Sequence, residues 1–300
     1  MNNHVIEVKG LKYTQNHFVL DIPNLQIPKG YITGLIGENG AGKTTLIYQL
    51  LNLTSPDEGS IKVFNQNYIE DRAGILSEIG IVFSENHFPD WMNAKKLETI
   101  MKMYFEQWDS QAYYHYLKRF EVPVKTKIKH LSQGMKVKLS LATALSHHAK
   151  LLILDEPTSN LDPTFRVELL KIFQDLMLDE EMTILFSTHI TSDLESIADY
   201  ICYIEKGKLI MMDEKDHILE DYKIVRGATS LLDEEIEQLL IGTEFYETTF
   251  TALTNEAQAM TELFGNEISI HNAGIDELMY FKKRERMHHG QTDKVVYTAQ

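Results

Sequence analysis

The sequence contains one cysteine, Cys202, among 300 residues, so no disulfide can form within the chain. Cys202 lies in the apolar run 200–204, which predicts a buried, unreactive thiol and fits a reducing compartment. The start of the chain lacks the basic region and apolar core of a signal peptide. No apolar run approaches the roughly 20 residues of a membrane helix. We therefore expect a cytoplasmic protein that reaches a membrane only through another chain.

Positive charge is also scarce. The chain has 29 Lys and Arg residues against 44 Asp and Glu residues, a formal net charge of −15. This acidic balance argues against a broad nucleic-acid footprint and against adhesion to anionic lipid. Apolar residues at 43% and charged residues at 24% are typical of a globular chain with a sizeable core. The length accommodates one large domain and a smaller one.

One glycine-rich stretch has the pattern of a phosphate-binding loop, so it must be locally positive although the chain as a whole is acidic. It lies between an apolar run, 31–36, and a helix-like run, 44–51, and matches the phosphate-binding P-loop, G-x-x-x-x-G-K-[ST]. The P-loop residues are Gly37, Glu38, Asn39, Gly40, Ala41, Gly42, Lys43 and Thr44. Glycines let backbone N–H groups approach phosphate oxygens, and the helix start adds a positive dipole end. An ordinary glycine turn is the alternative, which the strand and helix on either side disfavour.

The side chains that end the P-loop carry its chemistry. Lys43 offers a point charge to the β- and γ-phosphates, and the Thr44 hydroxyl can ligate Mg²⁺. A second apolar run, 151–154, ends in two carboxylates, Asp155 and Glu156. Because ligands bind at the carboxyl ends of strands in open α/β sheets, Asp155 would hold Mg²⁺ there and Glu156 would polarise an attacking water. The alternative, a solvated acidic turn, is weakened by the P-loop upstream.

Three further stretches complete a resemblance to the nucleotide-binding subunits of ATP-binding cassette (ABC) transporters, over about residues 5–215. Residues 131–135, Leu-Ser-Gln-Gly-Met, are similar to the L-S-G-G-Q signature of that family. Residues 160–162, Asn-Leu-Asp, resemble its D-loop, and residues 186–189 resemble the strand end that carries its switch histidine, here His189. A lone histidine at a strand end is more often structural, but five motifs in family order favour a functional one.

The resemblance implies a P-loop NTPase α/β fold with a mostly parallel core sheet, an antiparallel β subdomain and a helical subdomain. It also implies that ATP lies between the P-loop of one subunit and the signature of another, so that binding forms a dimer and hydrolysis releases it. The Ser132 hydroxyl and the free N–H groups of the helix that it begins form the second anion site. Water attacks the γ-phosphate directly, with Glu156 orienting it and His189 contacting the phosphate.

The expected catalytic residues are therefore Glu156 and His189. The expected nucleotide contacts are Tyr13, Gly37, Glu38, Asn39, Gly40, Ala41, Gly42, Lys43, Thr44, Thr45, Ser132, Gln133, Gly134 and Asp162. The expected Mg²⁺ ligands are Thr44, Asp155 and Glu85. Tyr13 is the candidate for stacking on the adenine, and an edge-strand tyrosine is an equally consistent interpretation of it.

Two places depart from the family pattern. Gln133 and Met135 stand where the family usually has Gly and Gln, a variant similar to that of a subgroup of bacterial exporters. After the strand-like run 79–83 the family places a Gln that touches Mg²⁺ and relays to the membrane subunit. That place is taken here by Ser84 or Glu85. Glu85 could replace the Gln through a water, or the contact is absent, and the sequence leaves both open.

The domain organisation follows from where the motifs end. We expect an ABC ATP-binding domain at 1–215, with its helical subdomain at about 90–146, and a small α+β accessory domain at 216–286. The polar stretch 287–300 is expected to be disordered. Asn93, Asp109, Ser132 and Asp162 are predicted helix N-caps. In the accessory domain a strand is expected at 245–251 and a helix at 232–240. This domain could support dimerisation, regulate turnover or brace the cassette.

The function indicated is an ATP-hydrolysing subunit that powers export of peptides, antibiotics or amphipathic toxins through a separate membrane permease. It would work at the inner face of the cell membrane, as a homodimer or as a heterodimer with a second ATPase subunit. The alternative is a soluble ABC-type ATPase on a ribosomal or nucleic-acid machine. The single cassette, the acidic balance and the lack of a coiled-coil insert favour the transporter, with no nucleic-acid partner.

Overall fold

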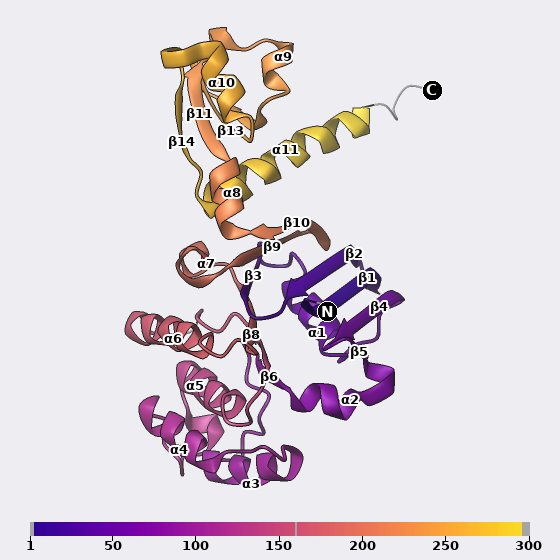
Figure 1. Ribbon diagram of the computed structural model, residues 1–300, viewed down its shortest axis with the longest axis vertical. Helices are drawn as coiled ribbons and strands as arrows, with labels where there is room; N and C mark the ends of the chain where they lie inside the picture. The colour runs from indigo at the N-terminus through magenta and orange to yellow at the C-terminus, as the bar shows by residue number, and fades with distance from the viewer. Residues whose placement is uncertain (1–2, 160, 296–300) are drawn as a thin grey trace. The chain divides into compact units, whose positions relative to one another are not determined.

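The computed structural model describes residues 3–159 and 161–295, with side chains as far as Met287. The chain divides into two compact units, Met1–Met212 and Asp213–Gln300 (Figure 1). We describe each unit by itself.

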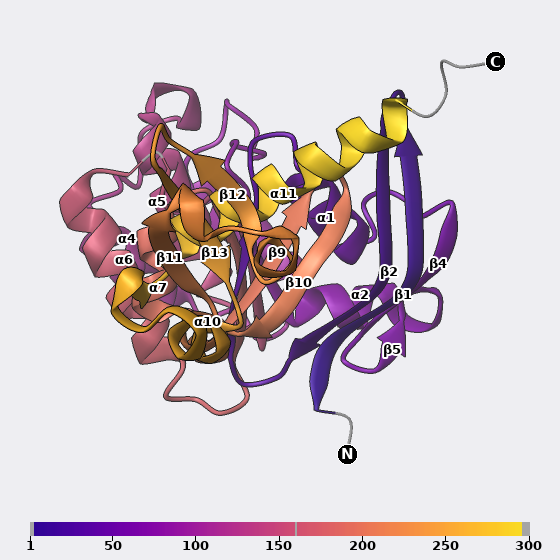
Figure 2. The ribbon, with the colours of Figure 1, turned by 90° about the horizontal axis from the view of Figure 1, so that it is seen from above.

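A ten-stranded mixed sheet forms the first unit. Its strands lie in the order β5-β4-β1-β2-β10-β9-β3-β8-β7-β6. Figure 2 shows β1, β2 and β4 side by side, and these strands pair antiparallel. Strands β3, β6, β7, β8 and β9 pair parallel. The strand bounds are β1 His4–Gln15, β2 Phe18–Pro28, β3 Ile32–Ile36, β4 Glu58–Val63, β5 Gln66–Asn67, β6 Ile79–Val82, β7 Leu151–Asp155, β8 Thr183–Thr188, β9 Tyr200–Glu205 and β10 Lys208–Glu214.

The central strands explain where ligand-binding groups gather. Every residue of β3, β7 and β8 is buried, as expected for parallel strands covered on both faces. Their register places Asp155 opposite Ser187 and Ile36 opposite Thr188. The carboxyl ends of the three strands therefore meet at one edge of the sheet, where the P-loop leaves β3.

Eight helical segments accompany this sheet. Their bounds are α1 Lys43–Leu50, α2 Tyr68–Ser77, α3 Ala94–Tyr104, α4 Ser110–Arg119, η1 Ile128–His130, α5 Gln133–Ala144, α6 Pro163–Leu176 and α7 Thr191–Ile197. The predicted N-caps Asn93, Asp109, Ser132 and Asp162 are confirmed, because each side chain accepts a bond from a backbone N–H of the first turn. Helices α3, α4 and α5 group together, away from β1 and β2 (Figure 1).

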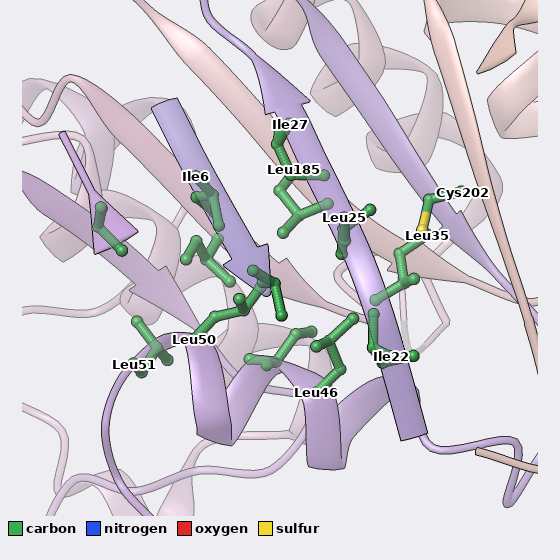
Figure 3. Close-up of a cluster of buried hydrophobic side chains, with 14 of the residues drawn as sticks. Ile6, Ile22, Leu25, Ile27, Leu35, Leu46, Leu50, Leu51, Leu185 and Cys202 are labelled. Carbon is green, nitrogen blue, oxygen red and sulfur yellow. The ribbon is translucent and has the colours of Figure 1, made fainter. Parts of the chain in front are cut away.

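A hydrophobic core of the first unit lies between α1 and the sheet. Leu46 and Leu50 of α1 pack toward Ile22 and Leu25 of β2, and Leu35 of β3 closes the cluster (Figure 3). Cys202 belongs to the same cluster, and burial raises the pKa of its thiol to about 12. The thiol is therefore inert at neutral pH, as the sequence predicts. This core fixes α1 to the strand that precedes the P-loop.

A four-stranded antiparallel sheet with helices around it forms the second unit. The strand order is β12-β13-β11-β14. The bounds are α8 Lys215–Asp221, β11 Lys223–Ala228, η2 Thr229–Leu231, α9 Glu234–Glu237, β12 Ile241–Phe245, β13 Thr249–Thr254, α10 Ala257–Phe264, η3 Gly265–Glu267, β14 Ser269–Asn272 and α11 Ile275–Val295. The predicted architecture, an α/β cassette sheet followed by α+β elements, is present.

Two local predictions for the second unit are wrong. The run 245–251 is not one strand, because a turn separates β12 from β13 and the N–H of Tyr246 donates to Thr249 O at 2.8 Å. The turn has no Gly, Pro, Asn or Asp to mark it, so the β-prone residues around it hid it. The predicted helix at 232–240 is reduced to α9, Glu234–Glu237.

The stretch from 287, predicted to be disordered, continues α11 as far as Val295, and 296–300 lie outside the described residues. The stretch 287–295 has no apolar period and contains Gly290 and two histidines, which are weak helix formers, so its sequence did not indicate a helix. Among the residues described, no helix is both long enough and apolar enough to cross a membrane.

The core under α1 gives a stability prediction. Leu50→Ala should lower the free energy of unfolding of the first unit by about 2–5 kcal/mol, because the side chain is fully buried and its loss leaves a cavity. Leu53→Ala removes the same atoms from a side chain that is 49% exposed, and should cost less than about 0.5 kcal/mol. Urea unfolding followed by tryptophan fluorescence reports on this unit, which contains both Trp91 and Trp108. Equal effects of the two substitutions would contradict the packing described.

Candidate functional site

The P-loop holds its lysine tightly. Lys43, the first residue of α1, is 6% exposed. Its ammonium donates to Gly37 O at 2.7 Å and to Glu38 O at 3.3 Å, and it lies 3.4 Å from Glu156 Oε1. A buried ammonium needs such partners because desolvation without them is costly. The cation is thereby fixed at the start of α1, where backbone N–H groups are also free to bind an anion.

Gly42 forms the turn that starts α1. Its φ of 108° lies in the left-handed region, and a Cβ there would stand 2.7 Å from Phe18 Cζ. A side chain at 42 would therefore strain the backbone and strike the Phe18 ring. This close approach places an aromatic ring against the loop.

A pocket of about 360 Å³ opens over the P-loop. Its lining consists of Gln15, Phe18, Glu38, Asn39, Gly40, Gly42, Lys43, Thr44, Thr45 and Glu156. Most of the predicted P-loop contacts therefore face one space. Gly37 and Ala41 are buried beneath it, where a Cβ on Gly37 would collide with Ile204 O.

The aromatic residue in this lining is Phe18, not the predicted Tyr13. Tyr13 pairs with Leu20 across β1 and β2, and its partly buried ring packs against the core cluster. The sequence favoured a tyrosine upstream of the loop, but the hairpin between β1 and β2 brings Phe18 over Gly42 instead. Tyr13 thus lies in β1, which pairs with both β2 and β4 and is not an edge strand, and its contact with a nucleotide stays a prediction.

Asp155 is the most buried carboxylate at this edge of the sheet, at 1% exposed. Its Oδ2 accepts from the Thr44 hydroxyl at 2.7 Å, and its Oδ1 accepts from the Ser187 hydroxyl at 2.6 Å. Ser187 Oγ also accepts from the N–H of Glu156 at 3.0 Å. The carboxyl ends of β7 and β8 and the start of α1 are therefore joined through one carboxylate.

Ser187 is a site residue that the sequence analysis did not single out. Strand pairing is the signal that could have identified it, because Asp155 and Ser187 stand opposite each other at the ends of adjacent parallel strands.

Glu156 connects the lysine of the P-loop with His189, which directly follows β8. Its Oε1 faces Lys43, and its Oε2 lies 2.7 Å from His189 Nδ1. The backbone of Glu156 has a φ of 52°, in the left-handed region that residues other than glycine seldom occupy. Strained backbone of this kind clusters at functional sites, where surrounding bonds maintain it. Here the N–H of Glu156 is held by Ser187 O at 3.1 Å and by Ser187 Oγ.

The oxygen donors at this edge fit a hard divalent cation. The Thr44 hydroxyl and the Asp155 carboxylate converge within hydrogen-bond distance, and oxygen ligands of this type are those that Mg²⁺ takes. Glu85 is exposed in the segment after β6. Burial raises the pKa of Tyr48, and the charges of Asp155 and Glu85 raise it further, so both carboxylates lie within electrostatic range of one phenol.

The signature begins α5 as predicted. Ser132 is the N-cap, and its hydroxyl accepts from the N–H of Met135 at 3.2 Å. The side-chain amide of Gln133, one of the two departures from the family pattern, donates to Ser84 O at 3.0 Å. The signature is thereby bonded to the segment that carries Glu85. Among the described residues that line the P-loop pocket, none belongs to 131–135.

Asp162 acts as the N-cap of α6 and accepts from the N–H of Phe165 at 2.9 Å. That hydrogen bond lowers the pKa of the Asp162 carboxyl, and the charge of Lys138 lowers it by a smaller amount. Asn160 of the predicted D-loop lies outside the described residues. The structure thus describes Asp162 as a helix cap, and its contact with a nucleotide stays a prediction.

A second buried carboxylate supports the region after Glu156. Asp193, 1% exposed on α7, accepts from the Thr158 hydroxyl at 2.8 Å and from Arg166 Nε at 2.8 Å. This network fixes the segment after Glu156 to the helix that follows His189. Sequence analysis missed it, because no spacing rule relates these three residues.

Comparison with known proteins finds relatives among the ATP-binding proteins of transporters. The protein-family model described as ABC transporter matches residues 20–159. A bacitracin transport ATP-binding protein of Enterococcus faecalis is 33% identical over 258 residues, which cover 83% of this chain and 81% of that protein. A lantibiotic transport ATP-binding protein of Streptococcus pyogenes is 34% identical over 219 residues, covering 71% of this chain and 92% of that protein.

Solved structures share the fold. The chain resembles an ATP-binding subunit of an ABC transporter with a TM-score of 0.65 at 24% identity, covering 72% of this chain and 92% of that one. It also resembles a dimeric bacterial ABC transporter cassette with a TM-score of 0.61 at 20% identity, covering 70% of this chain and 98% of the other. The bacitracin and lantibiotic relatives, the matching family model and the motifs of the site agree: the chain belongs to the ATP-binding proteins of ABC transporters.

Proposed function

We propose that this ATPase subunit hydrolyses ATP between its own P-loop and the signature of a second cassette, and so powers export through a separate membrane permease. The observation that carries the proposal is the bridge made by Glu156, which joins Lys43 to His189 beside the Thr44–Asp155 pair. One residue thus stands between a phosphate-binding cation, a histidine and a set of oxygen donors suited to Mg²⁺. This is the set of groups that phosphoryl transfer to water requires.

Each residue has a role that follows from its position. Lys43 and the N–H groups at the start of α1 bind the β- and γ-phosphates, and Phe18 supplies the aromatic face for the adenine. Glu156 orients the attacking water and receives its proton, and His189 contacts the γ-phosphate and holds the second carboxylate oxygen in place. Thr44 and Asp155 would hold Mg²⁺, with Glu85 as a further ligand through water. The bound cation would neutralise charge on the phosphates.

A second cassette would complete the site. In this chain Ser132 and the free N–H groups of α5 form an anion-binding helix start that does not line the pocket of its own P-loop within the described residues. A helix tip of this kind on another subunit can approach the γ-phosphate from the opposite side. ATP binding would then join two cassettes, either two copies of this chain or this chain and a related subunit.

The cargo proposed for the transporter is an amphipathic peptide or peptide antibiotic. The relatives named for bacitracin and lantibiotic transport support this class. The permease would be a separate membrane protein, with this chain bound peripherally at the inner face of the membrane. A soluble ABC-type ATPase on a ribosomal or nucleic-acid machine is the alternative, and the net charge of −15 argues against it.

The first prediction tests Glu156. Glu156→Gln should still bind ATP but hydrolyse it at least about a hundredfold more slowly, because the positioned base is lost while Lys43 and the loop remain. Turnover by the purified chain is measured beside bacitracin efflux from cells that express it with its permease. The conservative Glu70→Gln, exposed on α2 and absent from the lining of the P-loop pocket, should retain turnover. Near-normal hydrolysis by Glu156→Gln would show that Glu156 is not the residue that activates the water. Normal hydrolysis by the unsubstituted chain without any efflux would reject the export function.

The second prediction tests the hydroxyl between β7 and β8. Ser187→Ala should raise the Mg²⁺ concentration needed for half-maximal hydrolysis by about 10–100-fold, because Asp155 Oδ1 loses the donor that orients it. Ser187→Thr retains a hydroxyl and should restore most of the activity. A Mg²⁺ titration of the ATPase rate measures the effect, with Ser77→Ala on exposed α2 as the matched control. An unchanged Mg²⁺ midpoint in Ser187→Ala would contradict the role.

The third prediction concerns the bond between the signature and the segment after β6. Gln133→Ala should weaken ATP-induced pairing of cassettes by about 2- to 12-fold, the worth of one neutral hydrogen bond, since the start of α5 is less firmly placed. Pairing is measured by sedimentation across a range of ATP concentrations in the Glu156→Gln background. Gln111→Ala, on the exposed side of α4, is the control and should leave pairing unchanged. If both substitutions act alike, the Gln133 amide has no positioning role.

A further inference from the structure

The second unit contains a pocket of about 830 Å³, and none of the ABC motifs lines it. The pocket lies on one face of the four-stranded sheet, beside α11. The opposite face carries the core of the unit, with Val225, Ala252 and Met260 buried in it. Phe250 and Ile268 belong to that core and also line the pocket.

Close packing of α11 on β12 fixes one wall. Gly242, at the bulge in β12, has a φ of 64°, and a Cβ there would collide with the backbone of Phe281. The helix backbone thus lies directly on the strand, and Ile275, Leu278 and Phe281 are buried. Glu277, Tyr280 and Phe281 line the pocket from this helix. The width of the groove is set by packed backbone rather than by mobile side chains.

One end of the pocket carries an oriented carboxylate. The hydroxyl of Tyr280 donates to Glu244 Oε1 at 3.1 Å, and the hydroxyl of Tyr246 donates to Glu244 Oε2 at 3.0 Å. Tyr246 and Tyr280 nevertheless remain 57% and 48% exposed, so their rings stand open in the pocket. A carboxylate between aromatic rings is a favourable environment for an ammonium group.

An arginine stands farther along the same row of the sheet. Arg226 of β11 and Glu244 of β12 both pair with Thr251 of β13, so their Cα atoms are two strand spacings, or about 10 Å, apart. Within the described part of the chain, the Arg226 guanidinium has no hydrogen-bond or ion-pair partner, and Tyr246 feels its charge. A free guanidinium is suited to a carboxylate.

The hydroxyl groups and the net charge of the pocket lining further limit the class of ligand that it can bind. The Thr251 hydroxyl lies between the two charged ends, and the hydroxyls of Thr249 and Ser269 line the pocket beside them, so all three can bond to amide groups. Glu267 and Glu277 also line the pocket, so carboxylates outnumber the single guanidinium. This excess of negative charge disfavours a free anion such as phosphate and favours a ligand that brings a cation as well.

We infer that this pocket binds a short peptide with free termini, its ammonium group at Glu244 and its carboxylate at Arg226. An extended chain spans about 3.3–3.6 Å per residue, so about three residues bridge the two positions. The site would make the second unit a peptide-sensing part of the subunit. It is separate from the nucleotide site and does not depend on the proposed export function.

The test uses the full-length protein and the tripeptide Ala-Phe-Ala, with its N-acetyl and C-amide forms as matched ligands. Saturation-transfer NMR titrations give the three affinities. The free tripeptide should bind, and each blocked form should bind at least about tenfold more weakly, because one charge-assisted contact is lost. Glu244→Gln should abolish the preference for the free amine, and Arg226→Gln should abolish the preference for the free carboxylate.

Glu262→Gln and Arg72→Gln are the controls, since both side chains are exposed and neither lines the pocket. Thermal unfolding of each variant, followed by circular dichroism, checks that the second unit remains folded. Absence of saturation transfer, equal affinity for all three peptides, or preferences that survive both pocket substitutions would each overturn the assignment. If the unsubstituted protein shows these peptide preferences but does not hydrolyse ATP, the proposed nucleotide mechanism is rejected and the peptide site is retained.

Discussion

The two hydroxyl contacts to the buried Asp155 carboxylate are the constraint on which the cassette depends. A carboxylate that is 1% exposed cannot lack donors, and here Thr44 and Ser187 supply them from α1 and β8. The same bonds fix the distance between the P-loop and the end of the neighbouring strand. Glu156, the next residue, is thereby held between Lys43 and His189. Stability and chemistry at this edge of the sheet thus share one set of contacts.

A second small set of contacts joins separate segments of the first unit. The Gln133 amide bonds the start of α5 to Ser84, and Ser84 adjoins Glu85, whose charge reaches Tyr48 on α1. Asp193 joins the segment after Glu156 to the helix after His189 through Thr158 and Arg166. Gln133 and Asp193 thus make side-chain bonds between segments far apart in sequence, and these bonds hold the signature and the segment after Glu156 in place.

Much of this was predictable from the sequence, because glycine spacing, apolar runs and helix caps are local signals. The P-loop, the strand before Asp155 and the four N-caps follow from residues near one another in the chain. The choice between Tyr13 and Phe18 could not be made, because it depends on the register of a hairpin. Ser187 and Asp193 act across strands and helices, and the turn after Phe245 has no residue that marks it. Three-dimensional pairing, not residue type, decides these cases.

The backbone of Glu156 also limits which amino acids can occupy that position at all. At a φ of 52° a β-branched side chain is excluded by steric overlap, and only glycine, asparagine, aspartate and other unbranched residues fit with modest strain. Glycine or asparagine at this position would leave the turn intact while removing the carboxylate, so a cassette with this turn can lose catalysis without losing its fold.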